Sequence, residues 1–289
     1  MRRNRDVSYR RHYHPEIEQR KRLIRNFSLL GVILLLLIAL FFFSQSVYIN
    51  THYLFVSVIV LIGGLLPVFI SFEQRKPQAR EVVLLAVMTA LCVGVNVLCS
   101  HTIPIHAGTM LVILTGISLG PEAGFLVGAL GRLICNFFDG QGPWTPWQML
   151  TWGLLGLLAG LVFYRSHKRR RKTKCNDASV GTLDSSTQKK RKTSLQESIL
   201  CMTIFTFFSV FIIYGGVMNL SAWIMSHAAS PADTPLTKEA LLAVYATGVP
   251  YDILHGAGAA LCMFLFGDVL LQKIRRVQIK FGIYIGEER

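Results

Sequence analysis

The sequence lacks the short motifs that mark common catalytic and metal centres. It contains no G-x-S-x-G, H-E-x-x-H or Walker A motif, and no helix-borne pair of carboxylates. Its six cysteines are scattered, with no C-x-x-C pair and no Cys/His spacing typical of a metal site. We therefore expect free thiols, no cofactor, no metal and no enzymatic activity.

Acidic residues are also scarce, since the chain has 16 Asp and Glu against 30 Lys and Arg, a net charge of +14. A basic chain can indicate nucleic acid, but here 52% of the residues are hydrophobic, and several apolar runs reach the roughly 20 residues that cross a bilayer. This composition predicts an integral membrane protein that contacts membrane lipids and has its basic ends in the cytoplasm. We expect no nucleic-acid partner.

The apolar runs predict an all-α membrane protein with about eight transmembrane helices. No small-residue cleavage site follows the first run, so we expect it to be retained as an anchor. The predicted spans are 27–44, 53–72, 81–99, 105–119, 123–138, 147–164, 198–220 and 244–271.

The basic residues predict the orientation. Eight spans place five segments on one side, together with both termini, and all Lys and Arg except Arg132 and Lys238 fall in four of these segments. The five segments are 1–26, 73–80, 120–122, 165–196 and 272–289. We predict a basic cytoplasmic tail at 1–26, a hairpin at 27–72, a six-helix core at 78–276 with a disordered basic loop at 165–196, and a cytoplasmic tail at 277–289.

The breaks that face the other side, at 99–104, 139–147 and 219–243, lack basic clusters and would form a binding cup for an external solute. One wall of that cup is the segment 121–152, where an apolar run carries Arg132 and Asn136. Arginine is rare inside membranes, because a guanidinium in hydrocarbon costs several kcal/mol. A Gly/Pro loop follows Asp139, and Trp144 and Trp147 rim it.

Polar residues of two other spans point to the same outer side. Asp252 and His255 begin the last span, so an ion pair between Arg132 and Asp252 is geometrically feasible, either as a purely structural pair or as part of a ligand site. Asn96 in the third span, and the histidines His101 and His106 near its outer end, are further candidates, although a lone loop histidine is more often solvated.

Aromatic residues gather at the outer ends of the predicted helices. An interfacial belt explains part of the set, and an aromatic ligand site is the alternative. We favour Trp144 and Trp147 for the ligand because they belong to the structured loop. The set comprises Phe137, Phe138, Trp144, Trp147, Trp152, Trp223, Tyr245 and Tyr251.

Small residues at Ala86, Ala90 and Gly94 recur every four positions of the third span. Such a stripe lets another helix approach closely. It indicates either packing within this chain or docking of a partner.

From about residue 78 to residue 276, the chain resembles the substrate-binding S components of energy-coupling factor (ECF) transporters. The likeness lies in the six spans, in the AxxxA pattern at Ala86 and Ala90, and above all in the block GISLGPEAGFLVGALGRLICNFFDGQGPWTPWQMLTWGLLGLLAGLVF. The cobalamin-type S components are the most similar. The N-terminal hairpin and the long basic loop are departures from the family's pattern.

The resemblance implies a multi-pass protein of a prokaryotic plasma membrane that captures a vitamin, here cobalamin, from outside. It implies partners, namely a transmembrane coupling subunit and two ATPase subunits, with docking through Ala86 and Ala90. The ligand region corresponds to Arg132, Asn136, Asp139, Trp144 and Trp147. Two rival functions stay open: an autonomous ion-coupled transporter that uses Asp252, and a membrane enzyme acting on lipid or isoprenoid substrates.

Overall fold

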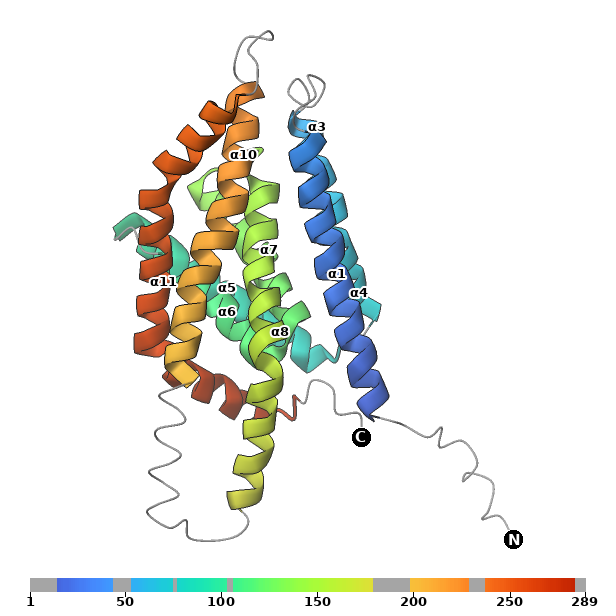
Figure 1. Cartoon of the computed structure of the whole chain (residues 1–289). Coiled ribbons are helices and arrows are strands. Elements are labelled where there is room, and N and C mark those ends of the chain that lie inside the picture. Colours follow the sequence, from blue (N-terminus) through green and yellow to red (C-terminus); the bar gives the residue numbers. More distant parts are fainter. Residues whose placement is uncertain are drawn as a thin grey trace, which may run out of the picture.

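The structure is a computed structural model that describes residues 15–43, 53–74, 77–102, 106–178, 198–228 and 237–283. Throughout these residues the regular structure is helical, with no strand, which confirms the predicted all-α class (Figure 1). Among the described residues, five helices are long and apolar enough to cross a membrane.

The helices follow the predicted spans in order and differ mainly at their ends. Short π-helical turns, η1 and η2, interrupt the second and seventh. The helices are α1 Pro15–Phe43, α3 Tyr53–Val60, η1 Leu61–Leu65, α4 Leu66–Gln74, α5 Ala79–Thr102, α6 Gly108–Leu119, α7 Pro121–Asp139, α8 Thr145–Ala178, η2 Val210–Tyr214, α10 Gly215–Ala228 and α11 Lys238–Lys280, with a further helix over 198–209.

Several helices extend well beyond their predicted spans, and α1 begins at Pro15, inside the segment that the sequence predicts as an N-terminal tail. α8 continues to Ala178, into the segment for which the sequence predicts a disordered loop; residues 179–197 of that loop lie outside the described residues. α11 starts at Lys238, where the Thr237 hydroxyl accepts a hydrogen bond from the Ala240 amide, and it accommodates Pro250. The N-terminal tail (1–14) and the end of the chain (284–289) also lie outside the described residues.

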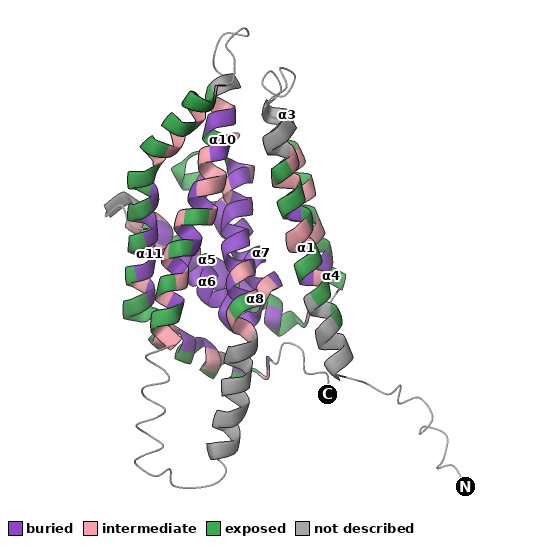
Figure 2. Ribbon diagram, in the orientation of Figure 1, coloured by how far each residue is buried: buried purple, intermediate pink, exposed green. Residues whose placement is uncertain are grey.

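Helix α6 forms the centre of the bundle. It has 12 residues, all of them buried, and α5, α7, α8 and α11 surround it (Figure 2). A helix of that length is about 18 Å long, shorter than the roughly 30 Å hydrocarbon core. Because every residue of α6 is buried, the helix faces neither lipid nor water and is a core element around which the longer helices pack.

Glycines bring α6, α7 and α8 into backbone contact. A Cβ added at Gly116 would lie 2.0 Å from the Gly156 carbonyl oxygen, and one at Gly156 would lie 2.3 Å from the Gly124 carbonyl oxygen. A Cβ at Gly128 would meet the Trp152 carbonyl oxygen at 2.4 Å. We call Gly116, Gly124, Gly128, Gly156 and Gly160 the glycine crossing. It fixes the spacing between α7 and α8, the two helices that carry most of the candidate site.

The N-terminal hairpin of α1, α3, η1 and α4 packs against α8. Its buried residues Ile33, Val56, Val60, Leu65 and Val68 share one hydrophobic cluster with α8 residues, which are Trp147, Met149, Leu150, Leu154 and Leu157. At one end of the hairpin, Arg25 and Ser71 both contact the Glu122 carboxylate, at 2.5 and 3.2 Å. Glu122 lies in the first turn of α7 after Pro121, where the helix dipole favours an acidic residue.

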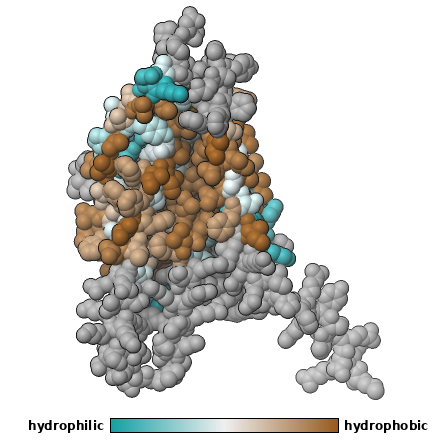
Figure 3. Space-filling model, in the orientation of Figure 1, coloured by the Kyte–Doolittle hydropathy of each residue, from teal (hydrophilic) through white to brown (hydrophobic). Residues whose placement is uncertain are grey.

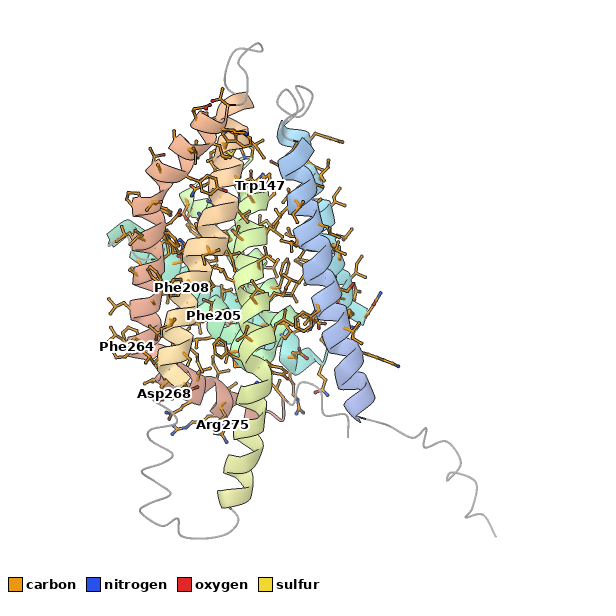
Figure 4. All side chains as sticks on the ribbon, in the orientation of Figure 1. Trp147, Phe205, Phe208, Phe264, Asp268 and Arg275 are labelled. Carbon is orange, nitrogen blue, oxygen red and sulfur yellow. The ribbon has the colours of Figure 1, made fainter. Side chains whose placement is uncertain are left out.

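The outer surface of the bundle is apolar, as a lipid-facing surface has to be. Large exposed side chains include Leu35 on α1, Val83 on α5 and Phe264 on α11. Hydrophobic residues dominate the middle of the face in Figure 3, and Phe264 lies at the outer edge of α11 in Figure 4. The start of α1 and the far end of α8 lie at the same end of the bundle in Figure 1. That is the cytoplasmic end according to the charge distribution.

Candidate functional site

Arg132 lies on α7, almost two turns from the outer end of that helix, and its charge is satisfied within the protein. Its side chain is 9% exposed. The guanidinium donates to the Asp139 carboxylate at 3.1 Å and to the Gln148 side-chain oxygen at 3.0 Å. It also lies over the Trp152 ring, 5.4 Å from the centroid, within cation–π range. A paired guanidinium can stay in the outer half of the membrane at a tolerable free-energy cost.

Asn136 extends this network by one turn. Its side-chain amide donates to Gln148 at 2.8 Å and to the Thr145 hydroxyl at 3.1 Å. The same hydroxyl accepts from the Gly142 amide and donates to the Gln141 side chain. The structure therefore joins Arg132, Asn136 and Asp139 in one network with the loop that follows α7, which turns at Gly140 with a φ of 104°.

Asn96 brings α5 to the same place. It is fully buried, and its amide lies 3.7 Å from the Cys135 sulfur, next to Asn136. Gly108, at the start of α6, packs directly on Asn96, because a Cβ there would lie 2.8 Å from the Asn96 Cβ. The Cys92 thiol donates to the Gly108 carbonyl at 3.3 Å.

A second polar group, from the start of α6 and from α11, adjoins the first. The His106 ring nitrogen and the Tyr251 hydroxyl lie 2.7 Å apart, and the Thr109 hydroxyl lies 3.0 Å from the His255 ring. The His255 ring contacts both His106 and Tyr214, with 4.5 Å between centroids in each pair.

Several buried polar atoms of these two groups have no hydrogen-bond partner among the described residues. Buried polar atoms are nearly always paired in folded proteins, so a cluster of unpaired ones indicates a place where a ligand or water binds. We call the two polar groups together the outer polar cluster. Its unpaired atoms are Asn96 Oδ1, His106 Nδ1, Asn136 Oδ1, Trp152 Nε1 and His255 Nδ1.

Asp252 and Arg132 bond to different partners. Its carboxylate accepts from the Asn219 amide of α10 at 2.8 Å, whereas Arg132 pairs with Asp139. The Arg132–Asp252 ion pair that the sequence suggested is therefore not the pairing in the structure. Asp139 is closer because it lies seven residues along α7, two turns away on the same face.

The two tryptophans of the outer loop have different surroundings. Trp144 is 37% exposed, and its ring packs over Gly142. Trp147 is fully buried, and its indole nitrogen donates to Ser57 of the hairpin at 3.2 Å. In Figure 4 it lies in the upper, outer part of the bundle. The side chain of His101 lies outside the described residues.

Sequence reasoning missed Gln148, which bonds both Arg132 and Asn136. A signal was present, because Gln148 is an amide in an otherwise apolar run, like Asn136 in the preceding helix. It also missed Thr109 and Tyr214. Both resemble ordinary helix residues in the sequence, and only packing shows that they contact His255.

The small-residue stripe on α5 is on the surface. Ala86, Ala90 and Gly94 are all exposed, and a Cβ added at Gly94 would meet nothing within 4 Å. We call this the open stripe. Among the described residues, no group of three or more His, Cys, Asp or Glu side chains could hold a metal ion, and the cysteines with described side chains are free thiols.

Comparison with known proteins supports the relationship that the sequence suggested. Residues 76–272 match the profile of the family described as "ECF-type riboflavin transporter, S component". UPF0397 proteins of Aliivibrio fischeri (strain MJ11) and Aliivibrio salmonicida are 36% identical over 90 residues, which is 29% of this chain and 48% of each relative. A UPF0397 protein of Vibrio atlanticus is 35% identical over a stretch of the same length.

The chain thus spans about half the length of the curated relatives that it matches. No solved structure shows a significant match. The family match covers more than half of the chain and includes both the outer polar cluster and the open stripe. This multi-pass plasma-membrane protein belongs to the family of ECF-type riboflavin transporter S components.

Proposed function

We propose that this chain captures a vitamin from outside the cell and delivers it into the cytoplasm as the substrate-binding subunit of an ECF transporter. The observation that carries the proposal is the outer polar cluster. Buried amide, imidazole and indole atoms without partners lie there around a neutralised arginine, in the outer half of the membrane. Small-molecule sites combine apolar walls with a few placed polar groups of this kind.

The charge of the cluster favours an uncharged part of the ligand. Arg132 is already paired with Asp139, and the unpaired atoms belong to amide, imidazole and indole groups. Asn96 Oδ1 and Asn136 Oδ1 are acceptors, and Trp152 Nε1 is a donor. Such a site would bind a ring system that offers both hydrogen-bond donors and acceptors. Cobalamin is the candidate from the sequence resemblance, and riboflavin is the candidate that the family's description favours.

Delivery would require partners, since the sequence carries no ATP-binding motif. We propose docking of a transmembrane coupling subunit on Ala86, Ala90 and Gly94, with two ATPase subunits supplying the energy. The exposure of all three residues supports this role, because small residues at a surface allow a second helix to approach closely.

The full-length chain in nanodiscs would test ligand capture by titration with cyanocobalamin and, separately, with riboflavin. We expect saturable binding of one of them and at least tenfold weaker binding by Arg132→Gln, since that change removes contacts with Gln148, Asp139 and Trp152. Arg25→Gln is the matched control, because it breaks the ion pair with Glu122 at the opposite end. Binding of neither probe by the wild-type chain would contradict the proposal.

The ion-coupled alternative depends on Asp252, a buried carboxylate on α11. Asp252→Asn keeps a hydrogen-bonding group beside Asn219 but removes the titratable proton. In an ATP-driven transporter this variant should retain uptake that depends on the ATPase subunits. Loss of uptake with intact ligand binding would favour ion coupling instead.

A further inference from the structure

The hairpin that precedes the family-matched region contacts the loop beside the outer polar cluster. Ser57 of α3 is buried and bonds two groups of that region. Its hydroxyl donates to the Pro143 carbonyl at 3.0 Å and accepts from the Trp147 indole nitrogen at 3.2 Å. One side chain thereby holds both the end of the outer loop and the first turn of α8.

From this loop a continuous set of hydrogen bonds leads to Arg132. The Gly142 amide, adjacent to Pro143, donates to the Thr145 hydroxyl at 3.2 Å. That hydroxyl also accepts from Asn136, whose amide reaches Gln148 at 2.8 Å. Gln148 in turn accepts from Arg132. The loop is therefore fixed by the hairpin on one side and by the polar cluster on the other.

Two neighbouring residues on α8 make the contacts with the hairpin and with the polar cluster. Trp147 turns toward the hairpin and bonds Ser57, whereas Gln148 turns toward the cluster and bonds Arg132 and Asn136. Any rotation of this turn that follows the loss of the Trp147 contact would move the Gln148 oxygen away from both partners. Hydrogen-bond strength falls steeply with distance and angle, so small displacements matter here.

We propose that Ser57 is a positioning residue for ligand binding, acting through Pro143 and Trp147 on the outer polar cluster. The inference is based on the proposed function of that cluster. It assigns the hairpin, which lies before residue 76 and hence outside the family match, a part in the binding site. The hairpin is then more than a lipid-facing addition to a complete six-helix core.

Ser71 provides a matched comparison within the same hairpin. Like Ser57 it is 3% exposed and donates one side-chain hydrogen bond to the core, in this case to Glu122 at 3.2 Å. Glu122 lies at the start of α7, at the cytoplasmic end, whereas Ser57 reaches the outer loop. A purely structural hairpin would make the two serines equivalent for ligand binding.

The test compares Ser57→Ala, Ser71→Ala and Ser57→Thr in the full-length chain in nanodiscs. The dissociation constant and dissociation rate are measured for cyanocobalamin or riboflavin, whichever the wild-type chain binds, together with the melting temperature without ligand. We expect about tenfold weaker binding for Ser57→Ala, through faster dissociation, because two buried groups lose their partner. Ser71→Ala should bind like the wild type. Ser57→Thr, or Ser57→Cys if the larger side chain does not fold, should restore most of the affinity.

Three results would overturn the inference while leaving the proposed function intact. These are wild-type affinity in Ser57→Ala, an equal loss of affinity in Ser71→Ala, and failure of both hydroxyl- and thiol-bearing variants to recover binding although they fold. Absence of binding by the wild-type chain would instead overturn the proposed function, and this inference with it.

Discussion

Two stripes of small residues in this protein have the same chemistry and opposite surroundings. The glycine crossing of α6, α7 and α8 is closed, because neighbouring backbones occupy the space of every missing side chain. The open stripe on α5, at Ala86, Ala90 and Gly94, is exposed. Four-residue spacing of small side chains thus predicts a close helix approach in both cases, but it does not say whether the approaching helix belongs to the same chain.

The difference between the stripes separates folding from association. In a membrane, helices gain little from excluding apolar surface from lipid, so close packing and hydrogen bonds have to hold them together. The glycine crossing supplies that packing inside the chain. On the open stripe, close packing has to come from a helix of a partner, which is why we propose that the coupling subunit docks there.

We expect the largest effect from adding a side chain within the glycine crossing. In Gly156→Ala the new Cβ would lie 2.3 Å from the Gly124 carbonyl oxygen and 2.4 Å from its carbon, and backbone atoms cannot move aside as a side-chain end can. We expect a loss of about 3 kcal/mol or more in stability. Thermal unfolding of the purified chain would measure this.

Gly31→Ala on α1 is the control for that change, since its Cβ would meet nothing within 4 Å. Equal melting temperatures for the two variants would mean that the crossing is looser than the structure shows.

Blocking the open stripe should have the next largest effect, on transport and not on folding. Ala90→Trp places a large ring on the proposed docking face, and we expect ATP-dependent uptake to fall about tenfold or more, equivalent to about 1.4 kcal/mol at the interface. Ligand binding by the isolated chain should stay unchanged. The measurements are uptake in cells and binding in nanodiscs.

The matched change Ala257→Trp, at an exposed position of α11, should leave uptake near the wild-type level. If both variants transport normally, α5 is not the docking helix.

A change at the junction between α5 and α6 should have an intermediate effect. Gly108→Ala would bring a Cβ 2.8 Å from the Asn96 Cβ and 3.0 Å from the Cys92 carbonyl oxygen, so that Asn96 has to shift. We expect ligand to bind about threefold to tenfold more weakly, with moderate destabilisation. Isothermal titration beside a melting curve would separate the two effects, and unaltered affinity would remove Asn96 from the site.

The smallest effect is expected from Gly94→Ala. Nothing lies within 4 Å of the new Cβ, and alanine is favoured over glycine inside a helix by up to about 1 kcal/mol. The melting temperature should therefore stay the same or rise slightly. A clear decrease would show that the open stripe is packed against something in the isolated chain.

The sequence predicted the helices and their order, because both depend on apolar length, whereas the orientation stays a prediction from the distribution of basic residues. It also identified Arg132, Asn136 and Asp139 as a group. Their pairing was not predictable, since the rotation of each helix decides whether Asp139 or Asp252 is nearer to Arg132. The burial of α6 and the orientation of Trp147 toward the hairpin likewise depend on packing between distant segments.

The Glu122 contacts have a consequence for how such a protein can change through evolution. A carboxylate that is 3% exposed at the start of α7 has its arginine partner on α1 and a serine partner on α4. Deleting the hairpin would remove Arg25 and Ser71 from this buried carboxylate, and a buried charge that loses partners destabilises the fold. The hairpin and Glu122 are therefore expected to change together: a shortened descendant would favour a neutral residue in place of Glu122, and a hairpin grafted onto another core would favour an acidic residue there as a partner for Arg25.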